Sequence, residues 1–149
     1  MTAGSKYASK TKTSTGRSRD ELEALLARYG VQHYGLLNQP GMLALAFQIG
    51  GHNHRIAIPL PDPQERRFRY GPGGGIRTEK GRQDAAQQEV RARYRALLLV
   101  VKARLELAHL LGQPVESAFS EYRVLSDGRT VQEHVTGTDN PPALTWGQP

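Results

Sequence analysis

The sequence predicts an α+β domain, because two helical patterns enclose a run of alternating strands. Apolar residues recur at every third or fourth position over residues 18–29 and again over residues 84–111. Between them, apolar and small or polar residues alternate over residues 42–49 and 54–60. We therefore expect an N-terminal helix, a three-stranded antiparallel meander, a long helix packed on the sheet and a small C-terminal hairpin or helix.

The first helix is predicted over residues 18–29. Ser18 and Glu21 have the spacing of a capping box, and Gly30 supplies a C-terminal stop. The apolar stripe of this helix consists of Leu22, Leu25, Leu26 and Tyr29. Residues 1–17 contain four Lys or Arg residues, no acid and a single aromatic residue, so we expect a disordered basic tail there. Residues 18–135 then form a single α+β domain, and residues 136–149, which contain three prolines, form a flexible tail.

Three strands are expected next, over residues 31–37, 42–49 and 54–60. The turn signals between them are residues 38–41, with Pro40 and Gly41, and residues 50–53, with two glycines. The inward-facing residues are expected to be Leu43, Leu45, Phe47, Ile49, Ile56, Ile58 and Leu60. The alternate prolines at 59, 61 and 63 cannot donate ladder hydrogen bonds, and they predict the end of the sheet.

The long helix is predicted from about Asp84, a possible cap, to about Leu111, before Gly112 and Pro114. Its core stripe consists of Val90, Tyr94, Leu97, Val101, Leu105 and Ala108. Residues 98–100 widen the apolar surface of this helix beyond what a three-stranded sheet can cover. We therefore expect the middle of the helix to be buried on several sides or to be covered by a second copy in a homo-oligomer. After Pro114 we expect a short helical turn with Val115 and Phe119 inward, then a small hairpin or a turn into a last short helix.

Composition limits the classes of function. The chain has no cysteine, which excludes disulfides, thiolate metal sites and a cysteine nucleophile. The apolar run of its long helix, residues 96–101, is far shorter than the ~20 residues of a membrane-spanning helix. The start of the chain has no apolar segment typical of a signal peptide, so we expect a cytoplasmic location.

The net charge of +6 is unevenly distributed. Residues 63–82 hold six basic residues against two acidic ones, and further cations lie along the long helix. Such clustering favours a polyanionic partner. The predicted nucleic-acid-binding residues are Arg66, Arg67, Phe68, Arg69, Tyr70, Lys80, Arg82, Arg91 and Arg95. In this interpretation the cations contact phosphate and the two aromatic rings stack on bases. The alternatives are a solvated helix face, and a flexible loop whose aromatic rings lie on the core.

The sequence offers no positive case for catalysis. His52 and His54 stand two apart in a hairpin, but the spacing suggests no third metal ligand, so no metal is expected. Ser117 and Ser120 have no evident base, and the glycines at 71–75 match no nucleotide-binding motif. We therefore expect a non-enzyme without cofactors, although an enzyme site assembled from scattered residues stays open.

Several segments carry a resemblance to a known family. Over roughly residues 18–135 the chain resembles a family of small uncharacterised proteins of tailed bacteriophages and prophages. The resemblance lies in the order of four segments, SRDELEALLARYG, IAIPLPDP, RARYRALLLVVKARLE and VLSDGRTVQEHV. The resemblance implies a phage or prophage origin and no particular activity. This chain differs from the family pattern at Tyr94, where a tryptophan is common, and at residues 117–121, where acids are common.

The leading hypothesis is a non-enzymatic protein that binds nucleic acid, with single-stranded DNA in phage recombination or replication favoured. The strand-strand-strand-helix order is similar to the core of phage single-strand annealing proteins, an analogy of fold and not of function. The alternative is a small phage inhibitor that binds a host or defence protein. The nucleic-acid hypothesis needs the cations of the central loop and of the long helix to converge in space, free of acidic neighbours.

Overall fold

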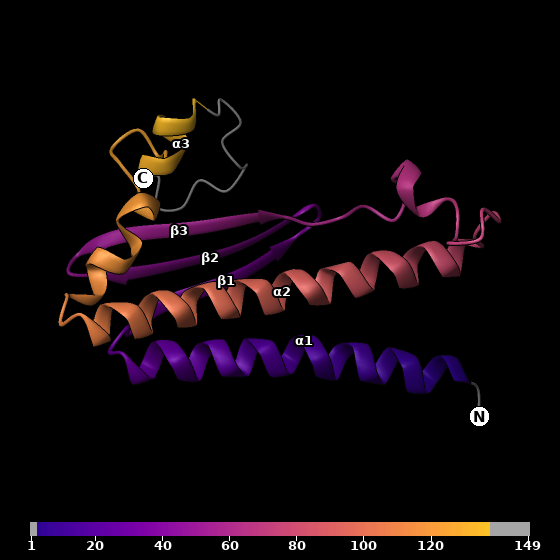
Figure 1. Cartoon of the computed structure of the whole chain (residues 1–149), viewed down its shortest axis with the longest axis horizontal. Helices are drawn as coiled ribbons and strands as arrows, with labels where there is room; N and C mark the ends of the chain where they lie inside the picture. Colours follow the sequence, from indigo (N-terminus) through magenta and orange to yellow (C-terminus); the bar gives the residue numbers. More distant parts are fainter. Residues whose placement is uncertain (1–2, 138–149) are drawn as a thin grey trace.

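Two helices cover one face of a three-stranded sheet. The structure is a computed structural model that describes the backbone of residues 3–137 and the side chains of residues 15–137. Strands β1 (His33–Gln39), β2 (Met42–Ile49) and β3 (His52–Pro59) form an antiparallel sheet in the order β1-β2-β3. Helices α1 (Ala3–Arg28) and α2 (Glu79–Leu110) lie side by side and run in the same direction (Figure 1). The predicted α+β class and the meander are confirmed.

Three shorter helices complete the described chain. They are the 3-10 helices η1 (Arg66–Phe68) and η2 (Val115–Tyr122) and the α-helix α3 (Val131–Thr136). The predicted flexible tail, residues 136–149, lies almost entirely outside the described residues, and so do the side chains of the predicted basic tail up to residue 14.

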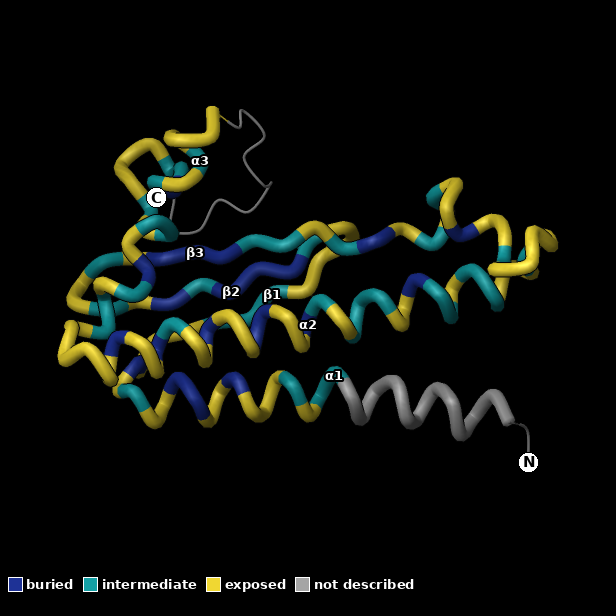
Figure 2. Tube along the Cα trace, viewed as in Figure 1, coloured by how far each residue is buried: buried dark blue, intermediate teal, exposed yellow. Residues whose placement is uncertain are grey.

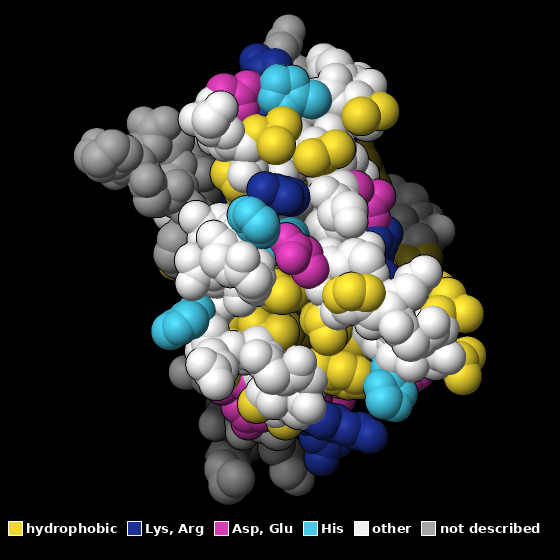
Figure 3. All heavy atoms as spheres, turned by 90° about the vertical axis from the view of Figure 1, so that its left-hand side faces the viewer, with side chains coloured by type: hydrophobic (Ala, Val, Ile, Leu, Met, Phe, Trp, Pro, Cys, Tyr) yellow, Lys and Arg dark blue, Asp and Glu magenta, His cyan; other side chains and the backbone are white. Residues whose placement is uncertain are grey.

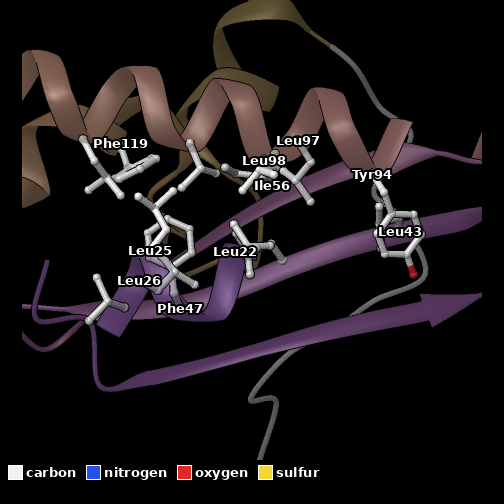
Figure 4. Packing of buried hydrophobic residues seen from close by; sticks show 14 residues of the cluster. Leu22, Leu25, Leu26, Leu43, Phe47, Ile56, Tyr94, Leu97, Leu98 and Phe119 are labelled. Atoms are coloured by element: carbon white, nitrogen blue, oxygen red, sulfur yellow. The ribbon is translucent and has the colours of Figure 1, made fainter. Parts of the chain in front are cut away.

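The core lies between the helices and the inner face of the sheet. Leu45 of β2 stands opposite Leu36 of β1 and Ile56 of β3, so these residues share one face. Figure 4 shows Leu22, Leu25 and Leu26 of α1 meeting Leu97 and Leu98 of α2 above this face. The predicted stripes of both helices are buried as expected, and Figure 2 shows buried and exposed residues alternating along α2.

The two hairpins set the strand boundaries. Gly50 and Gly51 have φ values of 60° and 80°, which two-residue type I′ turns require at both central positions. β3 therefore begins at His52, two residues before the predicted start. β1 begins at His33, also two residues from its predicted start, because Val31 turns into the core and its N–H donates to the Leu26 carbonyl.

Both long helices begin earlier than the sequence predicts. α1 extends back to Ala3, whereas the predicted start was Ser18. Residues 3–17 contain no proline, so nothing in them forces a helix to stop. α2 begins at Glu79 rather than near Asp84, because Thr78 is the N-cap: its Oγ1 accepts a hydrogen bond from the Gly81 N–H.

The C-terminal segment closes one end of the sheet. Phe119 of η2 is fully buried, and its ring meets Phe47 edge-to-face at a centroid distance of 4.9 Å. The Val124 N–H donates to the Asn53 carbonyl, and Val124 pairs with Thr130 in a small hairpin that leads into α3. This confirms both the inward phenylalanine and the hairpin followed by a short helix.

An ion pair connects α3 to the outer face of the sheet. Arg55 on β3 donates to both carboxylate oxygens of Glu133 at 3.0 and 3.1 Å, and Glu133 also completes the capping box with Thr130. Arg55 is only 3% exposed. The outer face around Ala46, which pairs with Arg55 across the two strands, is therefore partly covered at this end.

Removing the N-cap of α2 is expected to lower the stability of the protein. We expect Thr78→Ala to lower the free energy of unfolding by about 1 kcal/mol, because the Gly81 N–H loses its acceptor in the first turn. Urea denaturation followed by circular dichroism measures this loss. Gln83→Ala, at an exposed position one turn further on, is the control and is expected to change stability by less than about 0.5 kcal/mol. Equal losses in the two variants would contradict the capping role.

Candidate nucleic-acid interface

The predicted basic loop is an ordered arm. We call residues 60–78, which connect β3 to α2, the arm; it extends beyond the end of the sheet (Figure 1). Pro61 is buried, and Phe68 is only 6% exposed, so both anchor the arm to the fold. The guanidinium of Arg67 lies 4.3 Å from the centroid of the Phe68 ring. Phe68 is thus a packing residue, which agrees with the alternative that placed its ring on the core, and it has no free face for a base.

A chain of ion pairs fixes the base of the arm. The Arg67 Nε lies 2.6 Å from Glu65, and its Nη1 lies 2.8 Å from the Glu89 carboxylate of α2. Glu89 also accepts a hydrogen bond of 3.1 Å from Arg93, which in turn donates to the Pro59 carbonyl. The hydrogen bond from Arg67 is the main cause that lowers the pKa of Glu89. Arg67 is therefore bound within the protein and is not a free phosphate ligand.

The tip of the arm is a small hairpin. Tyr70 and Ile76 form an antiparallel bridge, the Gly71 N–H donates to the Gly75 carbonyl at 2.8 Å, and the Arg77 N–H donates to the Arg69 carbonyl at 2.8 Å. Gly74 has a φ of 82°, which a side chain would strain. The glycine run is thus a hydrogen-bonded turn. It holds the Tyr70 side chain 51% exposed beside the cations of the arm.

The arm and the first turn of α2 carry further cations besides Arg67. Arg66, Arg69 and Lys80 are exposed, and Arg77 is half-buried. None of the four forms an ion pair or side-chain hydrogen bond with a residue in the described part of the chain. Arg82 is half-buried, and its Nε is buried without a hydrogen-bond partner among the described residues. Four of the nine predicted residues, Arg66, Arg69, Tyr70 and Lys80, therefore remain available on this surface.

The helix cations do not join the arm. Helical residues two apart differ by about 200° around the axis, so Arg95 lies on the opposite edge of α2 from Arg93, which faces the arm. Arg95 lines a groove of about 390 Å³ between α1 and α2, together with Arg28, Lys102 and Glu21. Arg91 is half-buried and already has an interaction partner. Arg95 and the arm thus lie on different sides of α2, so the cations of the loop and of the helix do not converge on one surface as expected.

A second polar cluster lies at the other end of the molecule. The His52 Nδ1 is 2.6 Å from Glu116 Oε1, and both line an open hollow of about 800 Å³ with His54, Glu121 and Arg123. Figure 3 shows histidine, acidic and basic side chains gathered at this end above apolar surface. The sequence analysis missed this pairing, because His52 and Glu116 are 64 positions apart and no spacing rule connects them. No group of three His, Asp or Glu residues within residues 15–137 is arranged to hold a metal.

His54 is a structural member of this cluster. It is 1% exposed, stacks on Phe47 at a ring distance of 5.2 Å, and hydrogen-bonds the His52 carbonyl through Nδ1. Burial lowers the pKa of His54, because loss of solvation disfavours the imidazolium, although its hydrogen bond acts in the opposite direction. The ring is therefore held neutral and serves packing.

This neutral histidine predicts a pH dependence of stability. Below pH ~6.5 the unfolded chain protonates His54 while the folded chain does not, so the free energy of unfolding falls as the pH is lowered toward the depressed folded pKa. We expect His54→Gln to lose less stability than the parent over that interval. Urea melts at several pH values measure both profiles. Parallel profiles for the parent and the variant would contradict the buried neutral imidazole.

Comparison with protein-family models, with curated proteins and with solved structures returns no match for this chain. The resemblance to phage proteins therefore stays a prediction. Among the described residues, no helix is both long enough and apolar enough to cross a membrane. The assignment of a role to each surface depends on the geometry of that surface.

Proposed function

We propose that the protein is a non-enzymatic nucleic-acid-binding protein that holds a single strand on the arm. The observation that supports this most is that the arm and the first turn of α2 carry exposed cations without ion-pair partners among the described residues, Arg66, Arg69 and Lys80, as well as the exposed ring of Tyr70. Cations that lack internal carboxylate partners gain most from an external polyanion, because phosphates replace their counterions. The resemblance to phage proteins adds the expectation that this strand takes part in phage recombination or replication.

The exposed aromatic ring favours a single strand over a duplex. Half of the Tyr70 surface is open to solvent, and an unpaired base can stack on such a ring while a paired base cannot leave its helix without cost. The arm is already ordered by the Arg67–Glu89 pairs and by the hydrogen-bonded hairpin. Binding therefore needs little further ordering of the protein, which lowers the entropic cost of association.

Fluorescence anisotropy with a labelled single-stranded oligonucleotide and with the matching duplex tests this proposal. We expect single-strand binding to weaken with salt, with a slope of roughly −2 to −3 in log K against log salt for three or four phosphate contacts. We also expect weaker binding to the duplex. Absence of binding at low salt, or binding that does not depend on salt, would overturn the proposal. A partner recovered from nuclease-treated host lysate would instead support the inhibitor alternative.

A further inference from the structure

The outward face of α2 is apolar over most of its length. Leu99 is 52% exposed, Leu107 is 56% exposed and Leu110 is 80% exposed. The same face also carries three exposed alanines, Ala92, Ala96 and Ala103. At about 100° per residue, these six residues follow one line along the helix, opposite the buried line of Tyr94, Leu97, Val101 and Leu105.

This face differs from that of a helix whose only partner is a sheet. Such a helix carries charged or polar residues on the side away from the core. Here the outward line contains no charged residue from Ala92 to Leu110, a length of about 27 Å at 1.5 Å per residue. The alanines leave room for a second helix axis to approach closely, while the leucines supply the apolar surface that would be buried.

The charged residues on the two flanks of this line differ in whether they form ion pairs within the described residues. On one flank, Arg95, Lys102 and Glu106 are exposed and form no ion pair within the described residues. On the other flank, Arg93 pairs with Glu89, and Arg104 pairs with Glu121. Only the first flank therefore has charges available for a partner, and it holds both signs.

The charge pattern is complementary to itself in one orientation. In an antiparallel pair related by a two-fold axis, the same flank of each helix meets the other. With the axis between residues 100 and 101, Arg95 of one copy is level with Glu106 of the second copy, and this pair occurs twice. A parallel pair would instead bring Arg95 and Lys102 toward Arg93 and Arg104 of the second copy, and only Glu106 would gain an oppositely charged neighbour, Arg104.

We propose that the outward face of α2 is the contact surface of a homodimer, in which the α2 helices of two copies pack antiparallel about a two-fold axis near residues 100 and 101. The interface buries Leu99, Ala103 and Leu107 of each copy, and reciprocal pairs between Arg95 and Glu106 set the register. The arm touches this surface only at its N-terminal end, where Ala92 lines a hollow with Arg67, Phe68 and Arg77. The centre of the proposed interface lies further along α2, so each dimer presents two arms. The proposal does not depend on nucleic-acid binding.

Sedimentation of the full-length, nuclease-treated chain over a range of concentrations tests the dimer without nucleic acid. We expect twice the monomer mass for the parent, and a loss of the dimer for Leu99→Glu. Val135→Glu, at a position of α3 that is 82% exposed, is the matched control and is expected to stay dimeric. A parent chain that remains monomeric at every concentration would overturn the proposal, whatever its affinity for oligonucleotides.

A charge exchange separates the interface from an effect on folding. Arg95→Glu alone and Glu106→Arg alone each replace two attractive pairs by two repulsive ones, so we expect dimer affinity to fall about tenfold or more. An equimolar mixture of the two variants restores opposite charges at both pairs, and we expect a heterodimer with nearly the parent affinity. If the mixture dimerises no better than either variant alone, the antiparallel arrangement is wrong.

Discussion

Replacing Arg66, Arg69 and Lys80 together by alanine is expected to weaken single-strand binding about 100-fold at ~0.1 M salt. Each lost phosphate contact reduces the salt slope by about 0.7, so the slope becomes shallower by roughly 2. The three side chains are exposed and form no ion pairs within the described residues, so the substitutions leave the fold intact. Fluorescence anisotropy at several salt concentrations measures the affinity and the slope together.

The matched control removes the same charge from elsewhere. Arg28, Lys102 and Arg123 are also exposed, and they lie in the groove between the helices and in the histidine cluster, away from the arm. We expect their combined replacement by alanine to reduce affinity much less and to leave the slope nearly unchanged. Equal losses from the two triple variants would mean that net charge, and not the arm, determines binding.

Phe119→Ala is expected to lower the free energy of unfolding by about 3–5 kcal/mol. Phe119 is fully buried, and its ring contacts Phe47 at the point where η2 closes the end of the sheet. Truncation leaves a cavity and frees the C-terminal segment from the core. A domain of this size has a total stability of ~5–15 kcal/mol, so a large part of it depends on this ring. Urea denaturation of the parent and the variant measures the difference.

Phe119→Leu distinguishes loss of volume from loss of the aromatic contact. Leucine keeps most of the buried volume, so we expect its cost to stay below about 1.5 kcal/mol. A small loss for Phe119→Ala would contradict the placement of η2 in the core. It would indicate that the segment after Pro114 packs weakly on the sheet.

The fold was predictable wherever the pattern of apolar residues was local. The alternation over residues 42–49 predicted β2 without error, and the helical stripe that contains Tyr94 and Leu105 was correct along α2. The predicted starts of both long helices were wrong. Thr78 and Asp84 both have side chains that suit an N-cap, and the structure uses Thr78 for α2. Ser18, the predicted cap of α1, lies within that helix. At the second hairpin, the sequence predicted a turn over residues 50–53. The backbone angles of the structure show that the turn consists of Gly50 and Gly51.

The sequence predicted which kinds of residue form the candidate site, but it predicted less well how these residues lie relative to one another. The sequence predicted Arg91 and Arg95 on the long helix as partners of the loop cations, but it could not show that the arm packs against the opposite side of that helix. That side is set by the pair between Arg67 and Glu89, which are 22 residues apart. The role of Phe68 was likewise left open until its burial was known. Long-range pairs of this kind leave no spacing signal in the chain.

Photo-cross-linking of a single-stranded oligonucleotide to the full chain tests the central claim most directly. The oligonucleotide carries a photoreactive base, and mass spectrometry identifies the peptides joined to it. We expect cross-links at Tyr70 and in the peptide that contains Arg66 and Arg69, and we expect Tyr70→Ala to abolish the first of these. Cross-links confined to the histidine cluster or to the groove between α1 and α2 would contradict it.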